Sequence, residues 1–225
     1  MKPKSFRKAN NHKTVAMARK ANAAEAIGQL EKYQDNFIMT YGQFSLTDAL
    51  IAIIDITGPA DVTISTWTAA DAHLERAAQL VESADILNFR MIVDASFETR
   101  QPKYTAHMRA LFGDDCIRAI KTHAKFLVIR NEKWDIVVRT SMNLNGNPRL
   151  ENIEISENKE FADFFTKIAD EIFREVKPGL YKQRLPGLEG IDEMKTPYKL
   201  VKAEHIKRSS LNVPNTTHTL ERANR

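Results

Sequence analysis

Residues 122–129 read THAKFLVI, and two further stretches follow them along the chain, RTSMNLN at 139–145 and ENIEI at 151–155. The apolar run FLVI is typical of a buried β-strand, and we expect His123 and Lys125 to lie on that strand. Because side chains two residues apart point to the same face of a strand, these two side chains would lie together. Burying a histidine and a lysine is costly, so their face should open onto a cleft.

Ser141 and Asn143 are also two residues apart, on the strand that we expect next along the chain. If the two strands pair, one edge of the sheet presents an imidazole, an amine, a hydroxyl and an amide together. Such a set suits a phosphate group, because it offers one nucleophile, one cation and two neutral hydrogen-bonding groups.

Outward from these stretches, expected helices and strands alternate along the chain. The helices are 44–56, 69–83, 101–113 and 160–176, and the strands are 61–67, 89–96, 132–142 and 151–158, with a strand pair or one long bent strand over 116–131. This alternation predicts an α/β fold with a mixed, largely parallel sheet flanked by helices. One more helix is expected over 14–33, where alanine is frequent and Thr14 can act as N-cap.

Charge is distributed unevenly over the 225 residues. Residues 1–33 carry eight Lys/Arg against two Asp/Glu, and residues 177–225 carry ten against five, although the net charge of the whole chain is only +4. We therefore expect a basic N-terminal extension (1–43), a central domain (44–177) and a basic C-terminal tail (178–225) with one short helix near 199–208. Basic ends on an acidic body favour contact with a polyanion, and tails that are merely solvated are the alternative.

Several classes of protein are disfavoured by the composition. No run of 18 apolar residues occurs, so we expect no membrane span, and the basic N-terminus is not followed by the apolar stretch of a secretory signal. Cys116 is the only cysteine and should be a small buried hydrophobe, which favours a reducing, cytoplasmic setting. No cluster of His, Cys and Asp has the spacing of metal ligands, so no metal is expected.

The residues quoted above resemble the phospholipase D superfamily, whose signature is His-x-Lys-x4-Asp followed by Gly-Ser-x-Asn. This sequence has HAK at 123–125 and TSMN at 140–143. The resemblance extends over 60–175 in the order of the elements and is specific over 122–154. Two positions depart from the signature, because Arg130 stands where the family has Asp and Thr140 where it has Gly.

The resemblance implies a metal-independent phosphodiesterase without a cofactor, in which His123 attacks phosphorus and forms a phosphohistidine. Lys125 and Asn143 would bind the phosphate oxygens beside Ser141, and Glu154, with Glu151 as the alternative, would orient His123. A second histidine must protonate the leaving oxygen, and a chain with one motif would obtain it from a homodimer. Family members of this size with one motif are typically nonspecific nucleases, so the expected partner is nucleic acid, with DNA as the first choice.

Two alternatives remain open at this point. The first is a nucleic-acid-binding or assembly protein on the same fold with weakened or lost catalysis, which Arg130 and Thr140 motivate. The second, a phospholipid hydrolase, is disfavoured because no lipid-facing amphipathic stretch is visible. Outside the motif, we interpret His73 and His107 as surface histidines and Trp67 as packing in the core or at the rim of the cleft. The phenylalanines of the last expected helix are interpreted as core residues, and they are Phe161, Phe164, Phe165 and Phe173.

Overall fold

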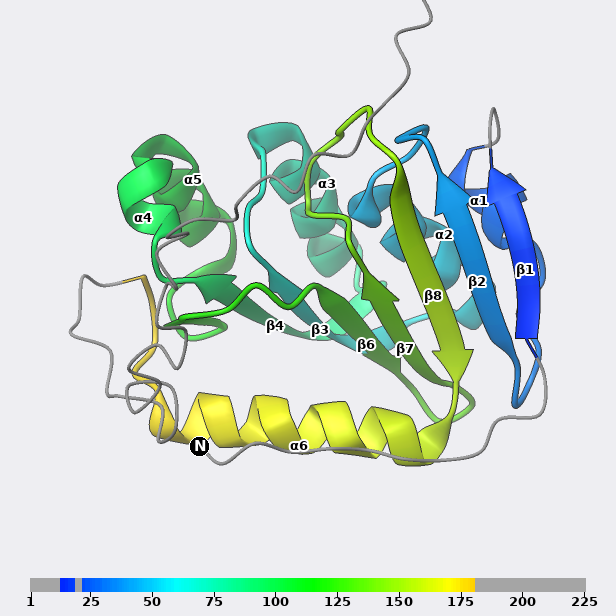
Figure 1. Cartoon of the computed structure of the whole chain (residues 1–225). Helices are drawn as coiled ribbons and strands as arrows, with labels where there is room; N and C mark the ends of the chain where they lie inside the picture. Colours follow the sequence, from blue (N-terminus) through cyan, green and yellow to red (C-terminus); the bar gives the residue numbers. More distant parts are fainter. Residues whose placement is uncertain (1–12, 19–21, 181–225) are drawn as a thin grey trace, which may run out of the picture.

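A computed structural model describes residues 13–18 and 22–180, which form one eight-stranded sheet between two layers of helices (Figure 1). In chain order the elements are β1 (Lys13–Ala18), α1 (Ala23–Ile27), β2 (Asp35–Thr40), α2 (Leu46–Thr57), β3 (Ala60–Thr66), α3 (Asp71–Glu82), β4 (Ile86–Asp94), α4 (Phe97–Arg100), α5 (Pro102–Phe112), β5 (Ile117–Ile120), β6 (Phe126–Arg130), β7 (Asp135–Thr140), β8 (Glu151–Glu157) and α6 (Lys159–Glu175). The strand order is β1-β2-β8-β7-β6-β3-β4-β5. The α/β class expected from the alternating pattern is therefore confirmed.

The sheet is mixed, but the expectation that it is largely parallel is wrong. Only the pairs β1–β2, β3–β4 and β4–β5 are parallel. The four pairs in the centre of the sheet are antiparallel, and they are β3–β6, β6–β7, β7–β8 and β8–β2. Strands that follow one another without an intervening helix tend to pair antiparallel. A turn at residues 131–134 joins β6 to β7 as a hairpin, and a loop without a helix joins β7 to β8.

Each face of the sheet buries its own apolar core. The helices α1 to α5 lie on one face, and α6 alone crosses the other (Figure 1). Along β6, Leu127 and Ile129 belong to the first core, whereas Phe126 and Val128 belong to the α6 core. This alternation explains why the run FLVI is apolar at every position, since both faces of the strand are covered.

The helices begin and end where local sequence signals are found. Ser45 caps α2 in a capping box with Asp48, and Gly58 ends that helix. Pro102 stands in the first turn of α5, and Gly113 follows its end. On α6, the ring of Phe165 packs against Phe126 with centroids 4.8 Å apart, and Phe161 and Phe173 pack against the same core, as expected. Phe164, also expected in the core, is half-buried and contacts the rings of Phe161 and Phe165.

The first part of the chain differs from the sequence prediction. A helix over 14–33 is wrong, because β1 occupies Lys13–Ala18 and only the short α1 follows. The stabilisation from parallel pairing of β1 with β2 outweighs the helix propensity of these residues. The local sequence contains no signal for that pairing. The same sheet therefore runs across the boundary expected at 43–44, whereas the predictions for 1–12 and for 181–225, the helix near 199–208 included, lie outside the described residues.

Two further observations concern classes of protein considered above. Cys116 is half-buried, its thiol donates to the Phe112 carbonyl at 2.8 Å, and burial raises its pKa, which agrees with a packing role. Among residues 13–18 and 22–180, no helix has both the length and the apolar character that a membrane crossing requires.

Candidate active site

The candidate site lies at one end of the sheet, beside the segment that joins β5 to β6. Because β3 and β4 lie between those two strands, residues 121–125 must pass the ends of both. Asp94, at the end of β4, accepts a hydrogen bond from the Thr122 N–H at 3.1 Å, and Ser65 in β3 donates to the Ala124 carbonyl at 2.8 Å. The crossing segment is therefore tied to both strands that it passes.

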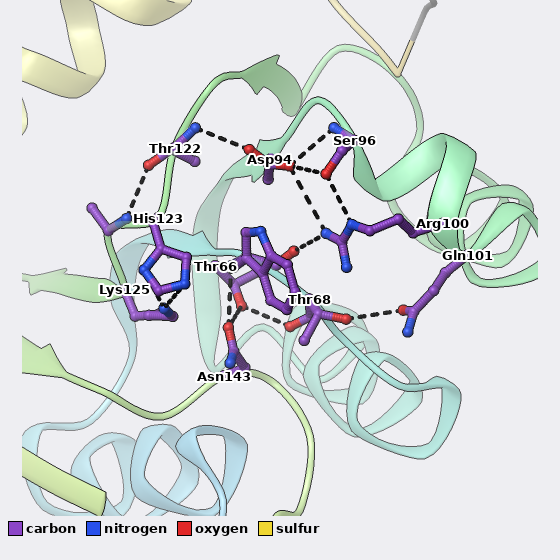
Figure 2. Close-up of polar contacts among 12 residues, drawn as sticks. Thr66, Thr68, Asp94, Ser96, Arg100, Gln101, Thr122, His123, Lys125 and Asn143 are labelled. Atoms are coloured by element: carbon purple, nitrogen blue, oxygen red, sulfur yellow. Dashed lines mark hydrogen bonds and ion pairs between the residues drawn. The ribbon is translucent and has the colours of Figure 1, made fainter. Parts of the chain in front are cut away.

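His123 and Lys125 lie on this crossing segment just before β6, and the expectation that they lie on the strand itself is wrong. The ladder begins only at Phe126, because the chain upstream has to reach across from β5. The two side chains nevertheless meet, with Lys125 Nζ 3.1 Å from both His123 Nδ1 and His123 Nε2 (Figure 2). His123 is exposed and Lys125 is half-buried, so the pair borders solvent.

Burial also changes the acidity of this pair. It lowers the pKa of the Lys125 amine from its ordinary value, and the Glu151 carboxylate acts in the opposite direction. A less solvated amine donates more strongly to an anion that displaces the remaining water. The Lys125 amine therefore lies at the solvent boundary, where an anion could reach it.

Ser141 lies at the end of β7, opposite the start of β8. Its hydroxyl donates to Glu151 Oε2 and accepts the Asn152 N–H at 3.0 Å, and its own N–H donates to the Asn152 carbonyl at 3.2 Å. The hydroxyl is exposed and stays beside the acid that influences Lys125. Glu151, the alternative in the sequence analysis, therefore contacts Ser141 directly and interacts with Lys125.

Asn143 is placed by β3 and by the residue that follows this strand. Its side-chain Oδ1 accepts the Trp67 N–H at 3.3 Å and faces the Thr66 hydroxyl at 3.5 Å (Figure 2). The carbonyl end of the amide is thus occupied by the protein, and its NH₂ end is the group that can donate to an anion.

Glu154 lies further along β8, where it is the register partner of Arg139 on β7. The two side chains form an ion pair, and Glu154 is half-buried. Arg139 also lies over the ring of Phe161, with 4.6 Å between Cζ and the ring centroid. The contact found for Glu154 therefore joins it to Arg139, whereas the ring of His123 has its polar contact with Lys125.

A cavity of about 500 Å³ opens beside these groups. Its polar wall is formed by His123, Lys125, Ser141 and Asn152, and Arg139 and Phe165 lie on the side toward α6. The cavity combines a nucleophile, cations and neutral donors with an aromatic surface, which is suitable for an organic phosphate. Within the described ranges, no group of three or more His, Cys, Asp and Glu side chains is arranged to hold a metal ion.

Several solved structures have limited similarity to this chain, with TM-scores below 0.5. A phospholipase D family member, Nuc, from Salmonella typhimurium is 13% identical over 59% of this chain and 90% of its own, with a TM-score of 0.45. NucT from Helicobacter pylori is 14% identical over 64% and 99%, with a TM-score of 0.47. Phosphatidylserine synthase from Haemophilus influenzae is 10% identical over 64% and 39%, with a TM-score of 0.45. No family model and no curated protein matches the sequence.

Arg130, the departure from the phospholipase D signature, lies at the opposite end of the sheet. Its guanidinium pairs with Asp135 at 2.6 Å and with Asp163 at 2.8 Å. Hydrogen bonds from Lys159 and Arg130 lower the pKa of the Asp163 carboxyl. A larger cavity of about 820 Å³ borders Arg130; its two arginines, Arg90 and Arg130, are paired with acids, and His123 is not among its lining residues.

Sequence reasoning missed Asp94 and Arg100 as residues of this site, and it left Trp67 between the core and the rim of the cleft. Asp94 has a local signal, because it ends the apolar strand FRMIVD with a carboxylate where the strand reaches the sheet edge. Trp67 and Arg100 have none, since their contacts depend on where the segment 121–125 crosses the sheet. Trp67 was expected at the rim of the cleft or in the core, and it is half-buried beside His123.

Proposed function

We propose that this chain is a phosphodiesterase of the phospholipase D type that acts on nucleic acid, as an endonuclease, through a phosphohistidine intermediate on His123. The observation that carries the proposal is the contact of Lys125 with both ring nitrogens of His123 at 3.1 Å, at the mouth of the 500 Å³ cavity. A cation beside the imidazole can bind the non-bridging oxygens of a phosphate while a ring nitrogen attacks phosphorus.

The proposed reaction has two displacements at phosphorus. A ring nitrogen of neutral His123 attacks, the N–P bond forms, the P–O bond to the leaving group breaks, and an acid protonates the departing oxygen. Water then loses a proton to the conjugate base of that acid and attacks phosphorus, so that the N–P bond breaks and His123 is restored. Lys125 and the NH₂ group of Asn143 hold the non-bridging oxygens during both steps.

The acid in this scheme is His123 of a second copy of the chain. One copy offers a single His–Lys pair at this cavity, and His123 is exposed at the molecular surface. A two-fold axis beside the site would bring two such pairs together in a closed, self-complementary interface. We therefore propose a homodimer as the active form.

Nucleic acid is the proposed substrate because of charge and because of the cavity. The basic ends of the sequence would hold phosphates without reading bases, while the aromatic side of the cavity accepts an organic group.

One feature favours the second candidate, a nucleic-acid-binding protein without turnover. The Glu151 carboxylate accepts the Ser141 hydroxyl and interacts with Lys125, and an acid at that position competes with a bound phosphate.

The test uses purified full-length protein with DNA, RNA and bis(4-nitrophenyl) phosphate in excess chelator. We expect turnover that persists in chelator and falls by roughly a hundredfold or more in His123→Ala. His107→Ala is the matched control, because His107 is bound to Asp71 on the helical layer, and it should keep wild-type turnover. Binding of DNA without any turnover would favour the second candidate, and turnover that requires added magnesium would contradict the mechanism.

A further inference from the structure

Three side chains from distant parts of the sequence lie next to one another at the site. The ring of Trp67, which follows β3, lies 5.6 Å from the ring of His123 with an angle of 59° between the planes. On the indole, the Arg100 guanidinium lies with its Cζ 3.8 Å from the ring centroid. The indole therefore has both the Arg100 guanidinium and the His123 ring as neighbours. Because the guanidinium occupies one face of the indole, that face is not available for stacking with a nucleobase.

Trp67 is also fixed through its backbone. Its carbonyl accepts a hydrogen bond from Arg100 Nη2 at 2.9 Å, and its N–H donates to Asn143 at 3.3 Å. The same guanidinium therefore binds both the ring and the carbonyl of Trp67. These contacts hold both the backbone and the ring of Trp67, so the indole has little freedom to move. We call the indole of Trp67 the wall beside His123.

Arg100 is in turn held by residues at the end of β4. Its Nε donates to the Ser96 hydroxyl at 2.8 Å, and its Nη2 lies 3.9 Å from Asp94 Oδ1. The other oxygen of Asp94 accepts the N–H of Thr122, directly before His123, at 3.1 Å. One carboxylate thus aligns the backbone that carries the histidine with the arginine that holds the wall behind its ring (Figure 2).

We infer that Trp67, clamped by Arg100 and Asp94, is the positioning residue for His123, an inference that rests on the function proposed above. His123 is exposed, and its polar contact is with Lys125, whose Nζ lies 3.1 Å from both ring nitrogens and so favours neither. A flexible lysine fixes the direction of an imidazole poorly, because its own side chain can follow the ring. The indole wall limits the ring rotation instead and keeps one nitrogen directed at the phosphorus. Trp67 does not contact the reacting atoms.

Nuclear magnetic resonance tests the positioning without requiring turnover. The ring-proton signals of His123, assigned by their loss in His123→Ala, should carry a shift caused by the neighbouring indole. Trp67→Ala should move them to the positions of unconstrained histidine, and Arg100→Gln should move them part of the way. Trp134→Ala is the control, because Trp134 is also half-buried and also has a cation over its ring, Lys32 at 4.2 Å, at the opposite end of the sheet. Unchanged signals in Trp67→Ala would overturn the inference.

Turnover of bis(4-nitrophenyl) phosphate gives the second measurement. Trp67→Ala should lower kcat by roughly tenfold to a hundredfold with little change in KM, and Trp67→Phe should recover part of the loss. Trp134→Ala should leave kcat unchanged. A rise in KM alone would show that Trp67 contacts the substrate, which contradicts a positioning role. If the wild-type protein turns over no substrate, the proposed function fails, and the resonance measurement still decides whether Trp67 fixes the ring.

Discussion

At the scale of single residues, Gly42 controls the loop that carries Ser141 and Asn143. It has a φ of +78°, and a Cβ atom at this position would lie 2.0 Å from the Asn147 carbonyl oxygen and 2.8 Å from Pro148 Cα. These are backbone atoms, so they cannot rotate away as a side-chain tip could. Position 42 therefore requires glycine for two reasons, the positive φ angle and the close approach of the backbone at Asn147 and Pro148.

Replacing Gly42 by alanine should destabilise the fold more than replacing a glycine that has a similar φ angle but room for a Cβ atom. Gly58 has a φ of +73°, and a Cβ atom there would meet nothing within 4 Å. Gly58→Ala should destabilise the protein by about 1–2 kcal/mol through backbone strain alone, and Gly42→Ala by more than that, with a loss of turnover from the displaced loop. Urea unfolding of both variants measures the difference. Equal destabilisation would show that the loop moves away without cost.

Residue pairs that depend on local spacing were predictable, and those that depend on crossing strands were not. The contact between His123 and Lys125 was predicted from their separation of two residues on a strand, and it is present although both residues precede that strand. Glu154 was expected to hold His123, but its contact with Arg139 is set by the register of β7 and β8. A register is a property of two strands together, and a single stretch of sequence does not contain it.

At the scale of elements, His73 joins α2, α3 and the loop after β7. Its Nδ1 lies 3.2 Å from the Ser45 hydroxyl at the start of α2, and its Nε2 accepts the Gly146 N–H at 3.0 Å. Because Gly146 donates, Nε2 carries no proton, and the arrangement requires a neutral ring. The interpretation of His73 as a surface residue is therefore wrong, and its half-buried ring ties three elements together.

Stability should consequently decrease in mild acid. Burial, with the cation of Arg76 acting in the same direction and Asp48 opposing it, lowers the pKa of His73 below its ordinary value. On acidification the unfolded chain therefore binds the proton first, so the stabilisation is present above about pH 6.5 and is lost as pH falls below it.

Urea unfolding between pH 5 and pH 8 measures this effect, in the range where histidine titrates. His73→Gln should remove much of the pH dependence. His107→Gln is the control on the neighbouring helix, where the ring lies 3.0 Å from Asp71. An unchanged pH dependence in His73→Gln would show that the Gly146 contact does not require the neutral ring.

The helices and most strands could be predicted because their signals are local. Ser45 and Gly58 delimit α2, and the amphipathic pattern of α6 agrees with its place over one face of the sheet. The strand β1 could not be predicted, since alanine favours a helix and only the pairing with β2 selects the strand. The separation of β5 from β6 by two strands is equally non-local, and it creates the crossing segment of the site.

At the scale of the whole molecule, the proposed mechanism makes the two copies of a dimer interdependent. Each reaction would use His123 of one copy as nucleophile and His123 of the other as acid. Mixing wild-type protein with an excess of His123→Ala and allowing subunits to exchange should therefore reduce activity further than dilution does. An excess of His107→Ala should cause no such loss.

Sedimentation of the wild-type protein is the companion measurement, and it should give a dimer at the concentrations that support turnover. A monomer that turns over substrate would contradict the two-histidine scheme. Activity that falls only in proportion to dilution in the mixing experiment would show that each copy works alone.

The chain has two tryptophans, and they occupy opposite ends of the sheet. Trp67 follows β3 at the site, and Trp134 lies in the turn before β7, each with a cation over its ring. This arrangement provides a pair of optical probes for the two ends of the molecule. With Trp134 replaced by phenylalanine, the remaining emission reports on the surroundings of His123. With Trp67 replaced, it reports on the distant turn, so that loosening of one end before the other becomes visible as two separate fluorescence transitions.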